Sequence, residues 1–356
     1  MNSVVKYFET NFESIELNEN NLVDSYSTLE KEINSVKYGV GIYNRSESAV
    51  IYLTGNDVLD FLNRISTNNV KELAPYHYIS TLFINDKGRL IDRTALIRLE
   101  DEFYLVGSKN NDAVLSRWID KYIITEDVKS ENKTNQFLIL DVVGPQAESY
   151  LTLICGKEVD DLDNNKLHKV EINNTISFLL KKKAGSGENL YWIISQIEHT
   201  NNLMDYLLSH KSVFDLSMVG EKAFDFYRVL NKVPKKPNEI NDNFNPHETC
   251  LINDVSFNKG CYIGQEVIAR LDTYDKVQKK MKKVKIEGAN SIKTPVEFFN
   301  KDKDLVGILT TVVNSDVNNH LEGLAIIREA YQKNNGLIDN LSINDNDYLI
   351  SLKILD

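Results

Sequence analysis

The sequence predicts an α+β protein made of two consecutive αβ units and a small β domain at its C-terminal end. Three observations support this prediction. The chain has 356 residues, whereas single hydrophobic cores stop growing at about 250 to 300 residues. Strand-like runs alternate with helix-like runs over most of the chain, which favours layers of sheet and helix. The last part of the sequence has only short strand-like runs separated by turns, as in small β domains.

Composition and charge narrow the class of protein. Hydrophobic residues make up 42% and charged residues 26%, which is ordinary for globular proteins. The net charge of −11 argues against stable binding of nucleic acid or of an anionic membrane. No apolar run is long enough to cross a bilayer, and residues 1–9 do not resemble a secretory signal. The three cysteines form no CxxC pair, so we expect a cytoplasmic protein with neither disulfides nor a metal site.

The first αβ unit is expected over residues 1–145. Its apolar residues alternate between the strand period and the helix period. The Asp86-Lys87-Gly88 turn between two apolar runs predicts a β-hairpin, because Gly88 can supply a positive φ. The expected elements are a helix through 29–33, a strand over 49–54, a helix over 57–65, hairpin strands over 78–84 and 90–99, a strand over 103–106 and a helix over 111–122.

The second unit is expected over residues 146–280 and the β domain over residues 281–356. Strands are expected over 137–143, 175–180 and 190–195, and an amphipathic helix near 202–209. A Pro- and Asn-rich loop over 231–248 is long enough to be functional or mobile. Six lysines lie between Lys276 and Lys285. We interpret this run as the solvated face of a linker rather than as an anion site.

The strongest local signal is the string KGCYIGQE over residues 259–266, followed by Arg270. Its two glycines indicate a tight turn, where side chains at Gly260 and Gly264 would obstruct a close approach. The turn leads into a helix. Cys261 lies just before the helix start and beside Lys259, and both features favour a thiolate. Cys261 is therefore the candidate reactive cysteine, and the alternative is a small residue used only in packing.

This string resembles the hallmark of YgfZ-type proteins, which are folate-binding relatives of the glycine cleavage T-protein and assist the assembly and repair of iron–sulfur proteins. The resemblance extends over nearly the whole chain and is weakest before Val40 and between Gly156 and Lys183. The blocks that share it are residues 41–44, 53–57, 61–62, 67–70, 86–90, 142–147, 227–228, 246–248 and 306–307. It implies that two ferredoxin-like αβ units and a small C-terminal β-barrel domain surround a central folate channel.

The resemblance implies tetrahydrofolate or a one-carbon derivative as the cofactor. A pterin presents neighbouring N–H donors, which a carboxylate accepts best, while its flat rings favour aromatic walls. Glu188 is the first choice for this carboxylate and Glu248 the second. Arg228 could bind an anionic group or pair with one of these glutamates. The residues assigned to cofactor binding are Glu188, Arg228, Glu248, Lys259, Tyr262, Gln265 and Asp92, with Cys261 as the functional thiol.

One departure from the T-protein pattern affects the expected activity. Only Asp92 matches the paired aspartates of the T-protein hairpin, and Arg93 replaces the second acid. Aminomethyl transfer needs a carboxylate near the reacting nitrogen, so we expect no such transfer. The leading hypothesis is a folate-binding factor that acts on iron–sulfur client or assembly proteins, as a monomer. A T-protein-like aminomethyltransferase and a non-catalytic folate-binding module remain as alternatives, and whether any reaction is catalysed stays open.

Overall fold

The computed structural model describes residues 3–13, 15–156, 159, 162–274, 276–314, 321–332, 336–343 and 346–355. The chain divides into two compact units, and each unit is built from separate stretches of sequence. The first unit consists of Met1–Asn63, Val70–Thr81 and Thr94–Tyr227. The second consists of Arg64–Asn69, Leu82–Arg93 and Arg228–Asp356. The boundary between the units therefore passes through several helices and strands instead of falling only in loops.

The first unit contains two sheets, and most strand pairs in both are antiparallel. The six-stranded sheet has the order β10 (Leu167–Ile172), β11 (Thr175–Lys183), β12 (Asn189–Gln196), β9 (Phe137–Val143), β3 (Val40–Asn44) and β13 (Leu216–Val219). Only its β3 and β13 pair in parallel. The five-stranded sheet has the order β5 (His77–Ile84), β6 (Leu90–Leu99), β7 (Glu102–Lys109), β4 (Ser48–Thr54) and β8 (Lys129–Asn132). The six-stranded sheet thus joins strands from both predicted αβ units.

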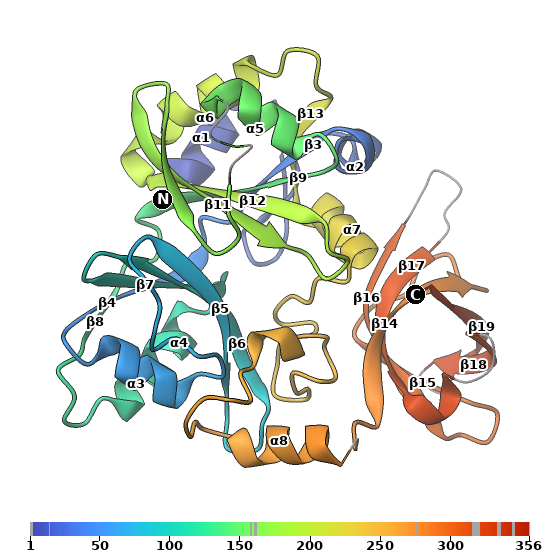
Figure 1. Cartoon of the computed structure of the whole chain (residues 1–356). Helices are drawn as coiled ribbons and strands as arrows, with labels where there is room; N and C mark the ends of the chain where they lie inside the picture. The colour runs from blue at the N-terminus through green and yellow to red at the C-terminus, as the bar shows by residue number, and fades with distance from the viewer. Residues whose placement is uncertain are drawn as a thin grey trace. The chain divides into compact units, whose positions relative to one another are not determined.

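Helices cover one face of the six-stranded sheet. They are α1 (Ser3–Asn11), α5 (Ala147–Cys155) and α6 (Thr200–Ser209), which lie on the same side of β9, β11 and β12 in Figure 1. Side chains along a strand point alternately to the two faces of the sheet. Leu138, Leu140 and Val142 of β9 therefore point to the same face and pack under these helices in one apolar core. The remaining helices of this unit are α2 (Leu29–Tyr38), α3 (Val58–Ile65), α4 (Asp112–Tyr122) and α7 (Glu221–Asn231), and α3 and α7 continue into the second unit. A short pair, β1 (Glu16–Leu17) and β2 (Val23–Ser25), lies apart from the two large sheets.

The predicted hairpin and the predicted β domain are both confirmed. Strands β5 and β6 flank a turn in which the backbone N–H of Gly88 donates to the carbonyl of Asn85 at 2.9 Å, and Gly88 has a φ of 70°. The C-terminal region forms a closed barrel, coloured orange to red in Figure 1. Around the barrel the strands are β14 (Lys279–Glu287), β17 (Leu321–Arg328), β16 (Leu305–Asn314), β15 (Val296–Phe299), β18 (Leu337–Ile343) and β19 (Asn346–Leu355).

The lysine-rich run forms barrel strand β14, so its interpretation as a linker was wrong. The alternate residues Val284 and Ile286 point into the barrel core, as the strand period requires. Four of the lysines are paired with carboxylates, three of them outside β14 and one, Glu287, in β14 itself. These ion pairs are Lys279–Glu248 at 3.8 Å, Lys280–Glu329 at 3.3 Å, Lys283–Glu322 at 2.9 Å and Lys285–Glu287 at 3.1 Å. The run is therefore not an uncompensated basic patch.

A second apolar core in the second unit brings the signature region against the hairpin. Tyr262 and Ile268 of the signature pack with Ile84 and Leu90 at the end of the hairpin, and Met281 of the barrel joins them. The signature loop leads into α8 (Gln265–Thr273), as predicted. Among the described residues, no helix is long and apolar enough to span a membrane.

Candidate functional site

The signature loop, residues 256–264, is attached by hydrogen bonds to the loop of residues 64–69. Both stretches belong to the second unit. The bonds are Lys259 Nζ to the carbonyls of Ser66 at 2.7 Å and Asn68 at 2.6 Å, Ser256 N to Thr67 O at 3.0 Å, and Ile263 N to Arg64 O at 3.3 Å. They lie on both sides of Cys261, so the segment that carries the cysteine is fixed at its two ends.

Lys259 has a strongly altered environment. Burial lowers the pKa of its amine to about 7, because a charged ammonium loses hydration in a poorly solvated position. Its two carbonyl acceptors favour the ammonium form and oppose this shift. The ring of Tyr262, which is only 8% exposed, lies 5.1 Å from Nζ. The amine of Lys259 is thus engaged in holding the loop, a role that the sequence did not indicate.

Only one of the two signature glycines is required by close packing. Gly264 has a φ of 77°, and a Cβ at this position would lie 2.5 Å from the carbonyl oxygen of Asn85. At Gly260, by contrast, a Cβ would meet no atom within 4 Å. The prediction that a side chain at Gly260 would obstruct a close approach is therefore wrong. Gly264 is the residue that lets α8 begin directly against the hairpin turn.

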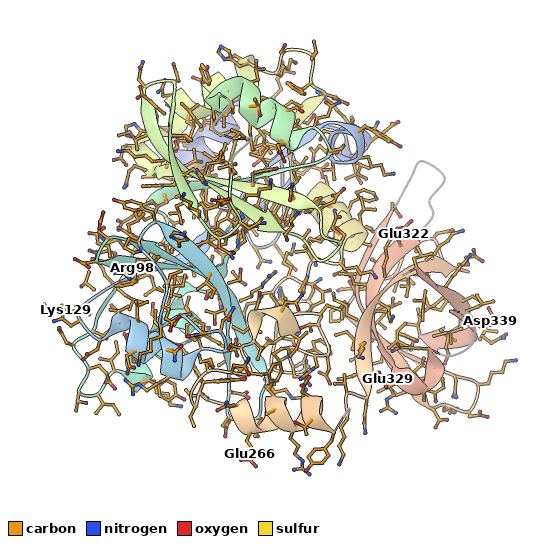
Figure 2. All side chains as sticks on the ribbon, viewed as in Figure 1. Arg98, Lys129, Glu266, Glu322, Glu329 and Asp339 are labelled. Carbon is orange, nitrogen blue, oxygen red and sulfur yellow. The ribbon has the colours of Figure 1, made fainter. Side chains whose placement is uncertain are left out.

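Cys261 is exposed, and so is Cys250, whereas Cys155 is half-buried. Three residues separate Cys261 from the first residue of α8, Gln265. The backbone N–H of Gln265 donates to the carbonyl of Tyr262 at 3.2 Å. On α8, Glu266 projects away from the helix into solvent (Figure 2). The exposure of Cys261 favours the reactive cysteine over a small residue used only in packing.

Asp92 and Arg93 have different surroundings although they are neighbours in β6. Asp92 is completely buried, and its Oδ1 accepts the backbone N–H of Arg93 at 2.9 Å. The guanidinium of Arg93 donates through Nε to Asp254 Oδ2 at 2.7 Å. The carbonyl of Asp254 also accepts the hydroxyl of Thr67 at 2.7 Å. Sequence reasoning missed Asp254, because it lies 161 positions from Arg93 and outside any recognised motif.

Glu248 is bound by cations of its own unit. Arg89 Nη1 lies 3.3 Å and Lys279 Nζ 3.8 Å from its carboxylate, which also accepts the backbone N–H of Asn245 at 3.0 Å. Burial raises the pKa of this carboxyl group, and the two cations and the backbone donor oppose the increase. Glu248 thus joins the hairpin, the loop around residue 245 and barrel strand β14.

Arg228 is enclosed by a buried network and does not pair with Glu248. Its Nη1 lies 3.0 Å from Glu239 Oε2, and the two side chains are 1% and 0% exposed. Its Nη2 donates to the hydroxyl of Thr311 at 3.0 Å, and this hydroxyl donates to Glu239 Oε1 at 2.7 Å. The Glu248 option for an Arg228 partner is therefore wrong, because Glu239 occupies the guanidinium.

In the first unit, Glu188 lies exposed in the turn between β11 and β12. This turn is closed by the backbone N–H of Ala184, which donates to the carbonyl of Glu188 at 2.8 Å. The carboxylate affects the neighbouring Tyr227. Burial raises the pKa of the Tyr227 hydroxyl, and the negative charges of Asp141 and Glu188 raise it further. The charge of the exposed Glu188 thus acts on the buried hydroxyl of Tyr227.

A group of cations around Trp192 lies on the sheet face opposite the helices, and the sequence analysis did not identify it. The guanidinium of Arg45 lies 4.1 Å and Lys182 Nζ 3.7 Å from the centre of the Trp192 ring. Arg45 also lies 3.4 Å from the buried carboxylate of Asp141. Burial raises the pKa of Asp141, and the charges of Arg45 and Lys182 oppose the increase. The one sequence signal was an aspartate within the apolar run 137–143.

Residues 4–259 match the family model described as the GCVT N-terminal domain. The chain belongs to this family. A curated relative, an aminomethyltransferase from Staphylococcus carnosus (strain TM300), is 24% identical over 245 residues, which cover 68% of this chain. The chain spans 66% of the length of that relative.

A solved structure supports the fold of this member of the GCVT N-terminal domain family. The crystal structure of the glycine cleavage system aminomethyltransferase T from Bartonella henselae matches with a TM-score of 0.83 and 17% identity, covering 99% of this chain and 96% of the other. The likeness confirms the predicted mixed α and β architecture with its C-terminal barrel. The predicted relation to the T-protein is confirmed by the family match.

Proposed function

We propose that this protein binds a reduced folate and, with Cys261 as its functional thiol, assists the assembly or repair of iron–sulfur proteins. The observation that supports this proposal is the position of Cys261. Cys261 is exposed, and the loop that carries it is attached through Lys259 and Ile263. A thiol on a loop fixed at both ends can meet a partner protein with little ordering cost. One cysteine cannot hold a cluster by itself, because clusters take about four thiolates.

The residues of the first and second units include the groups that a reduced folate requires. The exposed carboxylate of Glu188 suits the N–H edge of a pterin, and its charge raises the pKa of the buried Tyr227 hydroxyl. Asp92 supplies a buried carboxylate, and Gln265 an amide at the start of α8. Arg228, Glu248 and Lys259 are bound to groups of the protein itself, so we assign them to supporting the site. The folate would supply a one-carbon unit or accept one.

Folate binding is tested by titration calorimetry with tetrahydrofolate. We expect affinity in the micromolar range for the unaltered protein. Glu188→Gln should weaken binding about tenfold or more, because it removes a charged acceptor. Glu198→Gln is the matched control, since Glu198 is also an exposed glutamate of the first unit. Absence of binding to any reduced folate would exclude the folate assignment.

The role in iron–sulfur proteins is tested in a deletion strain complemented with the wild-type gene or with Cys261→Ser. We expect wild type to restore the activities of iron–sulfur enzymes and Cys261→Ser to fail, while enzymes without clusters stay unchanged. Cys250→Ser is the matched control, because Cys250 is exposed as well. Full rescue by Cys261→Ser would show that the thiol is not required, and the proposal would then be reduced to folate binding.

Aminomethyl transfer is the second candidate, and the family match favours it. The argument against it is that Arg93 replaces the second acid of the T-protein hairpin. The charge of Arg93 is balanced by Asp254, whose Oδ2 lies 2.7 Å from Nε. Asp92 remains a buried carboxylate in the hairpin. A general acid–base carboxylate in such a place could manage a proton at a reacting nitrogen.

A T-protein assay with a lipoyl carrier separates the two candidates. Turnover that is lost in Asp92→Asn and kept in Asp60→Asn would establish aminomethyl transfer and exclude the maturation role as the main function. The control residue Asp60 is an exposed aspartate on α3. No turnover, together with folate binding and loss of rescue in Cys261→Ser, is the result that we expect from the first proposal.

A further inference from the structure

An apolar cavity of about 320 Å³ lies within the first unit, between its two sheets. The five-stranded sheet contributes side chains from β4, β6 and β7, and the six-stranded sheet contributes side chains from β9 to β12. In Figure 1 these strands are the blue-green sheet and the green sheet of the first unit. The walls include three aromatic rings, those of Tyr104, Phe137 and Phe178, and the aliphatic side chains of Ile97 and Ile194.

The chemistry of the lining restricts what the cavity can bind. None of the described residues that line it is Lys, Arg, Asp or Glu, so a charged ligand would lose hydration without gaining a partner. Among the described lining residues, polar side-chain atoms come from Tyr104, Ser195, Gln196 and His199. The hydroxyl of Ser195 donates to the carbonyl of Ile176 at 3.3 Å. Gln196 and His199 are exposed and can donate to a ligand at this end.

The size and accessibility of the cavity favour a ligand over a packing defect. Protein interiors contain few voids larger than one water molecule, and this volume corresponds to about ten waters at roughly 30 Å³ each. Apolar walls offer such waters few hydrogen bonds, so an apolar molecule would displace them favourably. Ile176, which lines the cavity, is 55% exposed. The cavity can therefore be entered from the surface without unfolding either sheet.

The cavity is separate from the proposed folate residue of the same unit. Strand β12 runs from Asn189 to Gln196, with Glu188 just before its first residue and the polar end of the cavity at its last. At about 3.3 Å per residue, the two ends of the strand are roughly 23 Å apart. A ligand in the cavity would thus not contact Glu188.

We propose that this cavity binds an uncharged aromatic molecule of about two rings with one hydrogen-bond acceptor. The three aromatic walls favour flat rings through stacked and edge contacts. The absence of charged lining residues among those described requires an uncharged ligand, and Gln196 and His199 place the acceptor at one end. The volume lies at the lower end of the range for small-molecule sites. This inference does not depend on the proposed folate function.

Photolabelling with benzophenone tests the proposal directly, because benzophenone is uncharged and has two rings and one carbonyl acceptor. We expect saturable labelling at one site per chain, with adducts on peptides that contain β7, β9, β11 or β12. The variant Ile176→Glu should weaken labelling at least tenfold by placing a carboxylate at the entrance. The matched control Ile124→Glu should label as wild type, because Ile124 is 82% exposed and lies outside the lining.

Several results would overturn the proposal. They are labelling that does not saturate, adducts that map elsewhere, and equal labelling of Ile176→Glu and wild type. Mapping on the unaltered protein needs no variant, so an unstable Ile176→Glu would not prevent a decision. Cys261→Ser and Glu188→Gln should both label normally, which separates the failure of this inference from the failure of the folate proposal.

Discussion

At the scale of single residues, the candidate site depends on charged side chains that are paired or hydrogen-bonded within the protein. Lys259, Glu248, Arg228 and Arg93 all contact partners within the second unit. A buried charge without such partners would cost several kcal/mol. These residues therefore keep the site in place, whereas the exposed groups Glu188 and Cys261 are available to ligands and partners.

The buried amine of Lys259 predicts a pH dependence of stability. Its pKa falls from 10.5 to about 7 in the folded protein, so the unfolded chain binds more protons between about pH 7 and pH 10.5. Stability should therefore rise with pH across this window and be constant below it. In Lys259→Met this pH-dependent increase in the free energy of unfolding, which we expect to be about 1 to 2 kcal/mol, should be absent. The expected size is reduced to allow for the partial exposure of the Lys259 side chain. Urea unfolding at several pH values measures it, with the exposed Lys71→Met as control. Identical pH profiles for wild type and Lys259→Met would contradict the prediction.

Cys261 should react with iodoacetamide faster than the other two cysteines. Cys155 is half-buried against the apolar core, so it should be the slowest. Cys250 is exposed, but its sulfur lies 3.8 Å from the carbonyl of Met281, and donation to this carbonyl favours the unreactive thiol. Mass-spectrometric rates on native protein provide the measurement. Equal rates for Cys250 and Cys261 would show that the signature loop does not activate its cysteine. Slower labelling with tetrahydrofolate present would indicate that the ligand lies nearby.

The Arg228–Glu239 pair should be important for stability. Glu239→Ala would leave the guanidinium of Arg228 buried without its carboxylate, and loss of one partner of a buried pair costs about 3 to 5 kcal/mol. The exposed pair Lys71–Asp60, at 3.2 Å, gives a matched control, because Asp60→Ala should cost at most about 1 kcal/mol. Denaturant midpoints of both variants test the difference. Similar losses in the two would mean that the buried network contributes little.

At the scale of elements, the signature is a loop and a helix start that fit against a hairpin. Gly88 in the hairpin turn would place a Cβ 3.1 Å from side chains of Val267 and Ile268 on α8. Gly264 would place one against Asn85. The two glycines therefore allow the turn and the helix to approach closely, and together with Lys259 they set the position of the segment that carries Cys261.

The two signature glycines should respond differently to alanine. Gly264→Ala should cost about 1 to 3 kcal/mol, because it forces a side chain into a positive φ and toward a backbone oxygen. Gly260→Ala should change stability by less than about 0.5 kcal/mol, since its Cβ would meet nothing within 4 Å. Thermal unfolding and the alkylation rate of Cys261 are the measurements. A destabilised Gly260→Ala alongside a neutral Gly264→Ala would contradict this assignment.

At the scale of the whole molecule, strands from distant parts of the chain complete each sheet. In the six-stranded sheet β9 pairs with β3 on one side and with β12 on the other. Strand β3 belongs to the first predicted unit and β12 to the second. The apolar core beneath this sheet likewise combines residues from Val4 to Met218.

A fragment ending at residue 145 should therefore not fold cooperatively. It would keep β3 and β9 but lose β10, β11, β12 and β13, which leaves the apolar residues of β9 without α5 and α6 above them. Circular dichroism during urea unfolding should show a broad, non-cooperative change for this fragment and a sharp transition for the full chain. A sharp transition in the fragment would instead support an independent unit over residues 1–145.

Local structure and family membership follow from the sequence alone. The hairpin at residues 85–88, the helix after the signature loop and the β-rich C-terminal region follow from periodicity and turn residues, which depend on near neighbours. The blocks around residues 41–44, 86–90 and 142–147 indicated the relation to the T-protein, and the family match confirmed this relation.

The pairing of distant side chains, by contrast, depends on how the chain packs in three dimensions. Arg93 binds Asp254 from 161 positions away, Arg228 binds Glu239, and Lys259 binds two carbonyls more than 190 positions earlier. The same holds for the cavity, whose described walls come from seven strands. The physical reason is that a periodic pattern predicts which face of a helix or strand is buried, but it does not predict which other element packs against that face. Packing brings distant segments of the chain together, and each buried charge must then pair or form a hydrogen bond with a group that lies nearby in the fold.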